Sequence, residues 1–300
     1  MRVGSYFGGR ESDVIPGLLD ANPKNLRTFA VHHITAARTA MKISVITATF
    51  NSSATLADTL ASVVAQTYPD VEHIIVDGAS TDSTLTIVEH YRSAYERGGK
   101  TLRVVSERDR GIYDAMNKGI AMATGTLVGL LNSDDYFTSP DVLARVADAF
   151  STDATPDAGL DAVYGDVHYV DQHQTTRVVR HYSSAFFRPW MMRMGFMPAH
   201  PSFYCRRQLY AEHGGFDLDF RVAADFEQLL RMIFVGRINT RYLPMDFVTM
   251  RTGGASSSGM TSHKRIYRDH RAAYRKNGVY SNFLFEGCRY LYKIFELVRS

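Results

Sequence analysis

The first half of the chain alternates between short apolar runs and longer segments whose apolar residues recur at helical spacing. The apolar runs predict four strands, at residues 43–48, 71–76, 102–106 and 127–131. The other segments predict helices, at residues 52–66, 81–91, 112–123 and 141–150. Strands that alternate with helices of this length indicate an α/β fold with a mainly parallel sheet and right-handed crossovers.

The pattern changes after a polar loop at residues 151–159. Residues 162–170 and 175–182 flank the polar run Asp171-Gln172-His173-Gln174, which predicts a β-hairpin. Further strands are predicted at residues 201–205, 238–243 and 247–250, and helices at residues 207–213 and 224–235. We therefore expect a mixed, partly antiparallel second half.

The two ends of the chain differ from this pattern. Residues 1–40 show no clear periodicity, and we expect an N-terminal extension outside the core fold, upstream of a natural start at Met41. Residues 253–259 are all small and predict a flexible loop, either a lid or a linker. A basic, amphipathic helical tail is expected after it, so that residues 253–300 form a fourth segment.

Composition excludes several classes of protein. At 45% hydrophobic, 300 residues can bury a large core. The net charge of +3 is too balanced to indicate nucleic acid, although residues 260–300 alone carry nine basic and three acidic side chains. Cys205 and Cys288 have no metal or redox spacing and suggest a reducing compartment. No apolar run is long enough to predict a transmembrane helix, and glycine-rich dinucleotide and Walker motifs are absent.

Two adjacent carboxylates stand where the fourth predicted strand leaves the sheet, in Asn132-Ser133-Asp134-Asp135. Ligands of open α/β sheets bind at the carboxyl ends of strands, and Mg²⁺ or Mn²⁺ takes one or two protein carboxylates beside water and diphosphate oxygens. We expect a metal site here, and one division puts Asp135 on the cation and Asp134 on a sugar hydroxyl. The alternative is a cap for the helix that begins near Ser139.

Asp77 and Arg110 also follow predicted strands. The Asp77 carboxylate can accept a hydrogen bond from the imide N–H of uracil or the N–H groups of guanine, and the alternative is a turn into Gly78. Arg110 precedes a helix, where it can meet a diphosphate or the base. The alternative for Arg110 is a surface pair with Asp109 or Asp114.

Four segments together resemble the family 2 glycosyltransferases. They are Ile43-Ser44-Val45-Ile46-Thr47-Ala48-Thr49-Phe50-Asn51, Val76-Asp77-Gly78-Ala79-Ser80-Thr81-Asp82, Asp109-Arg110-Gly111-Ile112-Tyr113-Asp114-Ala115-Met116-Asn117-Lys118-Gly119 and Leu130-Leu131-Asn132-Ser133-Asp134-Asp135. The resemblance implies a GT-A fold and inversion at the anomeric carbon. The third segment looks most like the branch that builds bacterial exopolysaccharides, including colanic-acid-type enzymes. Asn132 departs from the Asp-x-Asp of many relatives, which leaves open which carboxylate holds the ion.

The resemblance also implies roles for individual residues. It places a nucleotide sugar against Thr47, Ala48, Thr49, Asn51, Asp77, Ser80, Arg110 and Asp134. Asp225 matches the aspartate that acts as the catalytic base, with Ala224 in place of the glutamate that commonly precedes it; the alternative is a helix cap. His200 matches a histidine near the acceptor and diphosphate, where a purely structural histidine is the alternative.

The resulting expectation is a metal-dependent, inverting glycosyltransferase that uses Mg²⁺ or Mn²⁺ and a UDP- or GDP-sugar. Residues 41–150 would bind the donor and residues 151–252 the acceptor, a saccharide that we expect to be lipid-linked. The aromatic and basic stretches at residues 186–197 and 282–298 suit contact with the inner face of the cytoplasmic membrane by a cytoplasmic protein, or they only cover the core. A sugar nucleotidyltransferase and a non-catalytic nucleotide-sugar-binding protein are the alternative functions.

Overall fold

The computed structural model describes residues 41–151, 159–172, 174–253, 259–282 and 285. The chain divides into two units, Met1–Ala40 and Met41–Ser300, and the description below concerns the second unit alone. The predicted N-terminal extension and most of the predicted tail at residues 282–298 lie outside the described residues.

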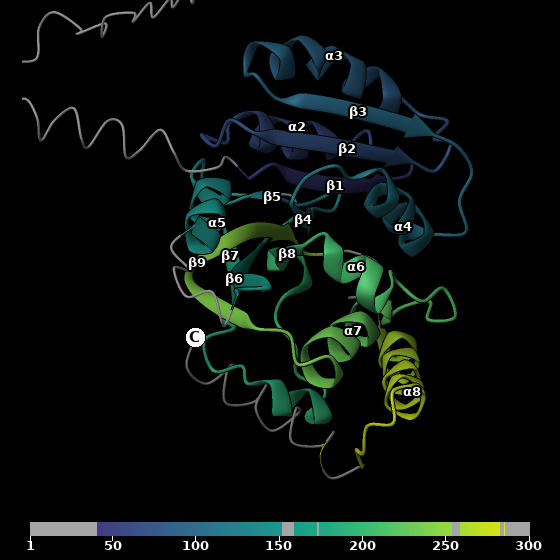
Figure 1. The fold of residues 1–300 in the computed structure, drawn as a ribbon. Coiled ribbons are helices and arrows are strands. Elements are labelled where there is room, and N and C mark those ends of the chain that lie inside the picture. The colour runs from purple at the N-terminus through teal and green to yellow at the C-terminus, as the bar shows by residue number, and fades with distance from the viewer. Residues whose placement is uncertain (1–40, 152–158, 173, 254–258, 283–284, 286–300) are drawn as a thin grey trace, which may run out of the picture. The chain divides into compact units, whose positions relative to one another are not determined.

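The first half forms the predicted parallel sheet. Its strands run in the order β3-β2-β1-β4, side by side in Figure 1, and every pairing among them is parallel. The strands are β1 (Ile43–Thr49), β2 (Val71–Asp77), β3 (Thr101–Ser106) and β4 (Leu127–Leu130). The helices are α2 (Leu56–Val64), α3 (Thr84–Arg97), α4 (Ile112–Met122) and α5 (Val142–Ser151).

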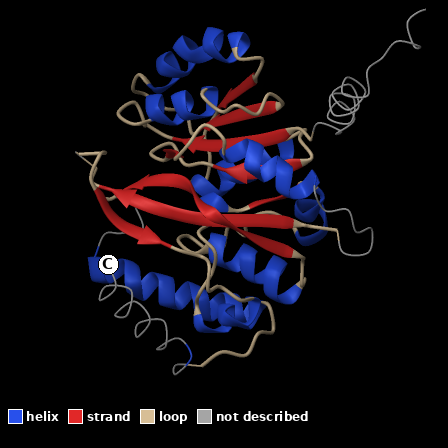
Figure 2. Ribbon diagram, turned by 90° about the vertical axis from the view of Figure 1, so that its left-hand side faces the viewer, coloured by secondary structure: helices blue, strands red, loops and turns tan. Residues whose placement is uncertain are grey.

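Burial on both faces explains why these strands are apolar throughout. Every residue of β1, β2 and β4 is buried. Alternate residues enter two separate cores: Ile46 and Ile74 pack in the core that contains Met116 of α4, whereas Ile43 and Ile75 pack in the other. Figure 2 shows helices on either side of the strands. Covering helices on both faces are what a parallel sheet requires.

The second half is mixed, as predicted. It contributes β5 (Tyr136–Phe137), β6 (Ala162–Val170), β7 (Val178–Tyr182), β8 (Tyr204–Arg206) and β9 (Thr240–Arg251). The sheet continues from β4 through β8, β6 and β9 to β5, and β7 pairs with β6. The pairings are antiparallel except for the parallel pair β6–β9.

A short connection forces this sheet to curl. β5 follows β4 after residues 131–135, yet β8, β6 and β9 lie between them in the sheet. In a flat sheet, four steps of about 4.8 Å would separate β4 from β5 by roughly 19 Å, near the limit of a fully extended connection. The connection turns instead, because the Asp135 N–H donates to the Asn132 carbonyl over 3.2 Å. Curling therefore brings β9 to the loop that carries Asp134.

Several predicted elements have different bounds. The strand predicted at 201–205 begins at Tyr204, because His200–Ser202 forms a 3-10 helix, η2, in which Pro201 has no N–H for a strand ladder. The strands predicted at 238–243 and 247–250 are one strand, β9, whose pairing with β6 is irregular around Pro244. β5, of two residues, is too short for a periodicity to predict.

Short helices cover the second half. The helix predicted at 224–235 is α-helical in α7 (Ala224–Leu229) and widens into a π-helical turn, η3 (Leu230–Val235). The others are α6 (Gln208–His213), the 3-10 helix η1 (Pro189–Met194) and α8 (Gly259–Lys276). α7 packs against α8, and both lie close together in Figure 1. None of the helices in the described residues is both long and apolar enough to cross a membrane.

Candidate functional site

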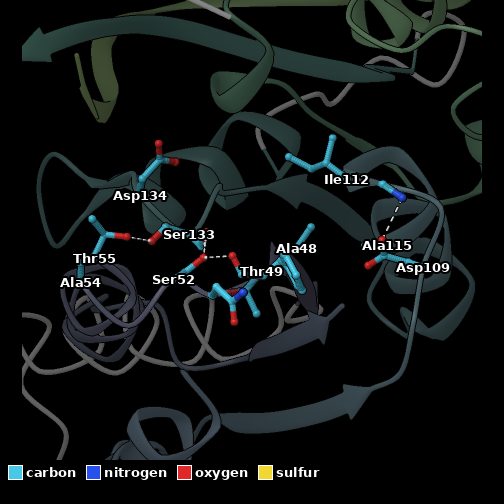
Figure 3. Close-up of a pocket in the computed structure, with 13 residues that line it drawn as sticks. Ala48, Thr49, Ser52, Ala54, Thr55, Asp109, Ile112, Ala115, Ser133 and Asp134 are labelled. Carbon is cyan, nitrogen blue, oxygen red and sulfur yellow. Dashed lines mark hydrogen bonds between the residues drawn. The ribbon is translucent and has the colours of Figure 1, made fainter. Parts of the chain in front are cut away.

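A pocket of about 540 Å³ opens at the carboxyl end of β1. It lies between the β1–α2 connection, the loop after β4 and the N-terminal turn of α4. In Figure 3, Asp134 stands on one side of it and Ile112 and Asp109 on the other, with Thr49 between them. The lining residues are Ala48, Thr49, Phe50, Asn51, Ser52, Ala54, Thr55, Asp109, Gly111, Ile112, Ala115, Ser133 and Asp134. The pocket therefore gathers segments from three of the four sequence motifs.

The end of β1 supplies a buried polar atom without a partner. Thr49 is 4% exposed, and its Oγ1 has no hydrogen-bond partner among the described residues. Thr47, by contrast, is fully satisfied: its hydroxyl donates to the Leu131 carbonyl over 2.7 Å and also bonds the ring of buried His73. Because buried hydroxyls are normally bonded, Thr49 is the residue of this strand that is left to contact a ligand.

Asp77 holds the turn beside the pocket. Its buried carboxylate accepts hydrogen bonds from the Ser80 N–H over 2.9 Å, from the Ser106 hydroxyl over 2.6 Å, and from the Ser80 hydroxyl. Ser80 in turn accepts a bond from the N–H of Asn51, which has a φ of 49°. This is the turn-forming alternative for Asp77, and contact with a nucleotide base stays a prediction.

Asp109 lines the pocket, but the neighbouring Arg110 does not. A Cβ at Gly78 would meet Asp109 Oδ2 at 2.7 Å, so only glycine allows Asp109 to approach the β2 turn this closely. The Arg110 side chain is 76% exposed and pairs with Asp114 at 3.3 Å. The surface-pair alternative describes Arg110 in this structure, and its contact with a diphosphate remains a prediction.

Hydroxyl groups of the β1–α2 connection fix the loop after β4. Thr55 donates to the Ser133 carbonyl over 2.9 Å, and the Ser52 and Ser133 hydroxyls are 2.9 Å apart, as Figure 3 shows. Thr59 donates to the Asp135 carbonyl over 2.7 Å, and Arg251 of β9 donates to the Asp134 carbonyl over 2.6 Å. The backbone that presents Asp134 is therefore held from both halves of the sheet.

Asp134 and Asp135 have different surroundings. Asp134 faces the pocket, whereas Asp135 is 1% exposed and its carboxylate accepts a bond from the Asn132 amide over 2.8 Å. Burial, and then the charge of Asp134, raise the pKa of Asp135 far above its usual range. Asp134 is therefore the carboxylate of this pair that lines the pocket, and which of the two holds an ion stays a prediction.

Asp225 and His200 form a second group, which touches the pocket wall through α4. Asp225 Oδ1 accepts a bond from the N–H of Phe226 over 2.8 Å and lies 3.4 Å from the Tyr113 hydroxyl, whose shorter bond, 2.7 Å, goes to the Val222 carbonyl. Burial lowers the pKa of His200, and the nearby Asp225 charge opposes that shift. His200 Nε2 is buried and has no partner among the described residues.

α4 connects these two groups. Ile112 and Ala115 line the pocket, whereas Tyr113, between them in the same turn, reaches Asp225. Asn117 of this helix exchanges hydrogen bonds of 2.8 and 2.7 Å with the backbone of Phe216, between α6 and α7. The motif from Asp109 to Gly119 thus holds the mixed half against the parallel half, a role that its sequence did not predict.

Pocket residues that the sequence did not single out are mostly short and uncharged. Ser133, Thr55 and Ile112 are examples. Ser133 and Ile112 lie inside quoted motifs, which is the only signal that marks them. Thr55 has no such signal, because its contact with Ser133 spans 78 residues of sequence.

The fold and the pocket together define a mixed α/β protein with a ligand-sized site at the carboxyl end of its parallel strands, and comparisons with known proteins give the family. Residues 44–212 match the model of Glycosyl transferase family 2. The chain belongs to this family. It is 33% identical to a PGL/p-HBAD biosynthesis glycosyltransferase of Mycobacterium bovis over 232 residues, which cover 75% of this chain and 82% of that protein.

Solved structures confirm the expected fold class. TarS of S. aureus, residues 1–349 in complex with UDP-GlcNAc, has a TM-score of 0.56 and 20% identity, covering 78% of this chain and 66% of that one. The match to a longer TarS chain covers 39% of that TarS chain. A mannosyltransferase of Pyrobaculum calidifontis in complex with GDP-Man and Mn²⁺ has a TM-score of 0.52 and 17% identity, covering 92% and 88%.

Proposed function

We propose that this protein is an inverting glycosyltransferase that moves a sugar from a nucleotide-diphosphate sugar to a saccharide acceptor in bacterial surface-glycan biosynthesis. The observation that carries the proposal is the pocket at the end of β1. It is lined by Asp134 and by Thr49, whose buried hydroxyl has no hydrogen-bond partner in the described parts of the chain. Its volume of about 540 Å³ is in the range of small-molecule sites. The relatives solved with UDP, UDP-GlcNAc or GDP-Man support such a donor.

The donor pocket fits a divalent metal ion. Asp134 offers one carboxylate there, and Ser133 adds a hydroxyl. Mg²⁺ and Mn²⁺ are bound through one or two carboxylates, with water and substrate phosphates as the other ligands, so this oxygen set is sufficient. When bound, the ion supplies positive charge for the departing diphosphate. Asp135, bonded to Asn132, positions the loop without reaching the ion.

Asp225 is the base in this proposal. Its carboxylate takes the proton of the acceptor hydroxyl while the acceptor oxygen bonds the anomeric carbon. The bond from that carbon to the diphosphate oxygen breaks, and the nucleoside diphosphate leaves from the opposite side. His200 Nε2, which is buried near Asp225 and has no partner in the part of the chain that the structure describes, would orient the acceptor hydroxyl or a diphosphate oxygen.

A lipid-linked acceptor is supported by the surface around η1. Phe186 and Trp190 are 65% and 59% exposed; Arg188 lies between them in sequence, and Arg193 follows. Exposed aromatic rings with basic neighbours favour an anionic membrane surface. Phe186→Ser with Trp190→Ser should reduce co-sedimentation with vesicles of anionic phospholipid. Unchanged sedimentation would remove the membrane from the proposal and leave the donor chemistry intact.

The test of the function uses Asp225→Asn. A thermal-shift screen of UDP-, GDP- and dTDP-sugars with Mn²⁺ first identifies the donor. We expect Asp225→Asn to bind that donor with unchanged Kd but to lose about 10²–10⁴-fold in kcat for transfer to alkyl saccharides. Exposed Asp219→Asn is the matched control and should retain full activity. The anomeric configuration of the product, by NMR, checks inversion.

Other outcomes identify the alternatives. Wild-type turnover by Asp225→Asn would refute the base. Donor binding without transfer to any acceptor would point to a nucleotide-sugar-binding protein. Formation of a nucleotide sugar from a sugar phosphate and a nucleoside triphosphate would point to a nucleotidyltransferase.

A further inference from the structure

Three ligand atoms converge on the second half of the sheet, in a cluster that takes no part in the proposed transfer. Asp166 of β6, His181 of β7 and Asp246 of β9 each place one nitrogen or oxygen atom within 4.8 Å of the others. We call them the strand cluster. Asp166 and Asp246 are paired in register between β6 and β9, and β7 pairs with β6 on its other side. Side chains fixed on adjacent strands form a more rigid site than side chains on loops.

The charges of the strand cluster call for a cation. Its two carboxylates face the same histidine: His181 Nε2 is 2.8 Å from Asp246 Oδ1 and 3.9 Å from Asp166 Oδ2. Within the described part of the chain, these carboxylates form ion pairs with His168 and His181 and with no lysine or arginine. The two carboxylates therefore lie close together without a lysine or arginine beside them in the described residues, as at sites that take a divalent ion.

Each carboxylate is also held in place by neighbouring groups. Asp166 accepts bonds from the Ser184 N–H over 2.6 Å and from the Tyr242 hydroxyl over 2.8 Å. His168 lies 3.3 Å from Asp246 through Nδ1, and its Nε2 is 2.9 Å from the Thr249 hydroxyl. Supporting hydrogen bonds of this kind orient the ligands of metal sites.

The geometry suits a small ion with mixed ligands. Two ligand atoms about 2.1 Å from a tetrahedral Zn²⁺ lie about 3.4 Å apart, and the two distances from His181 bracket that value. The His181 side chain is 51% exposed and that of Asp246 30%, so one side is open for entry of the ion and for a water ligand. Imidazole with carboxylate favours Zn²⁺, whereas oxygen ligands alone favour Mg²⁺ or Mn²⁺.

We propose that the strand cluster is a second metal site, which binds a Zn²⁺-type divalent ion through Asp166, His181 and Asp246. It differs from the donor site at Asp134 in its strands and in its nitrogen ligand. A bound ion links β7 to β9. Among the described strands, β7 otherwise pairs with β6 alone. The proposal is independent of the transfer reaction and survives if the donor or base assignment fails.

The test is a Zn²⁺ titration of protein freed of metal with a chelator. Asp134→Asn removes the donor-site carboxylate and serves as the background. We expect this variant to bind one equivalent of Zn²⁺, to give the visible absorption of tetrahedral Co²⁺ when Co²⁺ replaces it, and to melt at a higher temperature with the ion. Adding His181→Ala or Asp246→Asn should weaken binding at least tenfold and abolish the Co²⁺ spectrum.

Two controls test whether the strand cluster itself binds the ion. His90→Ala removes an exposed histidine elsewhere and should change nothing. His181 is half exposed, so the fold should tolerate its replacement. Circular dichroism of the variant checks that it folds. Failure of the Asp134→Asn background to bind Zn²⁺, or equal affinity in the His181→Ala variant, would overturn the proposal and identify the cluster as an internal ion-pair network.

Discussion

The two halves of the sheet position their candidate functional residues in different ways. In the parallel half, the candidates lie at or soon after the ends of strands that are buried on both faces: Thr49 ends β1, and Asp134 lies in the loop after β4. In the mixed half, Asp225 and His200 lie on a short helix and a 3-10 turn; Asp225 contacts Tyr113 of α4, and His200 packs against Phe216. The first arrangement is set locally, and the second depends on packing between distant segments.

The sharpest test of the parallel half compares Asp134→Asn with Asp135→Asn. We expect Asp134→Asn to weaken Mn²⁺-dependent donor binding and transfer by 10²-fold or more, since a metal supplies several kcal/mol of charge stabilisation. Asp135→Asn, in a buried site bonded to Asn132, should change both by less than about tenfold. Calorimetry with the screened donor and steady-state kinetics measure this. The opposite ranking would return the ion to Asp135.

That comparison also shows how far the sequence could lead. The end of the fourth strand was predicted as the acidic site because apolar runs and polar strand ends are local features. Which carboxylate faces the pocket was not, since it depends on the Asn132 amide and on Arg251 from β9. Likewise, the sequence placed Asp77 and Arg110 after strands. Their bonds to Ser80, Ser106 and Asp114 appear only in the fold.

The mixed half was predicted as a class but not in its contacts. The hairpin of β6 and β7 follows from local polarity. β5 and the strand cluster could not be predicted in this way. Both depend on β9, which pairs with β5 and with β6 across more than 70 residues of sequence. The continuity of β9 was not predicted either, because it contains Pro244 and proline is a poor strand residue.

The junction between the halves can be broken without touching either site. Gly129 of β4 is paired with Tyr204 of β8, and a Cβ there would lie 2.0 Å from the Tyr204 ring. Gly129→Ala should therefore cost about 1–3 kcal/mol of unfolding free energy, the usual range for overpacking. Urea denaturation measures it. Gly159→Ala, with no atom of the described residues within 4 Å of the added Cβ, is the control and should change stability little. Equal stability of the two variants would mean that β4 and β8 separate easily.

The smallest effect is expected at the contact that joins the two groups of functional residues. Tyr113→Phe keeps the ring stacked on Phe216, with centroids 5.3 Å apart, and removes the hydroxyl that reaches Val222 and Asp225. Loss of one such hydrogen bond costs about 0.5–1.5 kcal/mol, so kcat should fall about three- to tenfold with the donor Kd unchanged.

A matched control distinguishes positioning of Asp225 from loss of stability. Tyr68→Phe removes a 2.8 Å bond to the Met41 carbonyl within the parallel half, so it should cost a similar unfolding free energy but leave kcat unchanged. Urea denaturation and steady-state kinetics of both variants measure this. A kcat of Tyr113→Phe equal to that of the wild type, at the same loss of stability, would show that α4 only braces the mixed half and that Asp225 is oriented by its own helix.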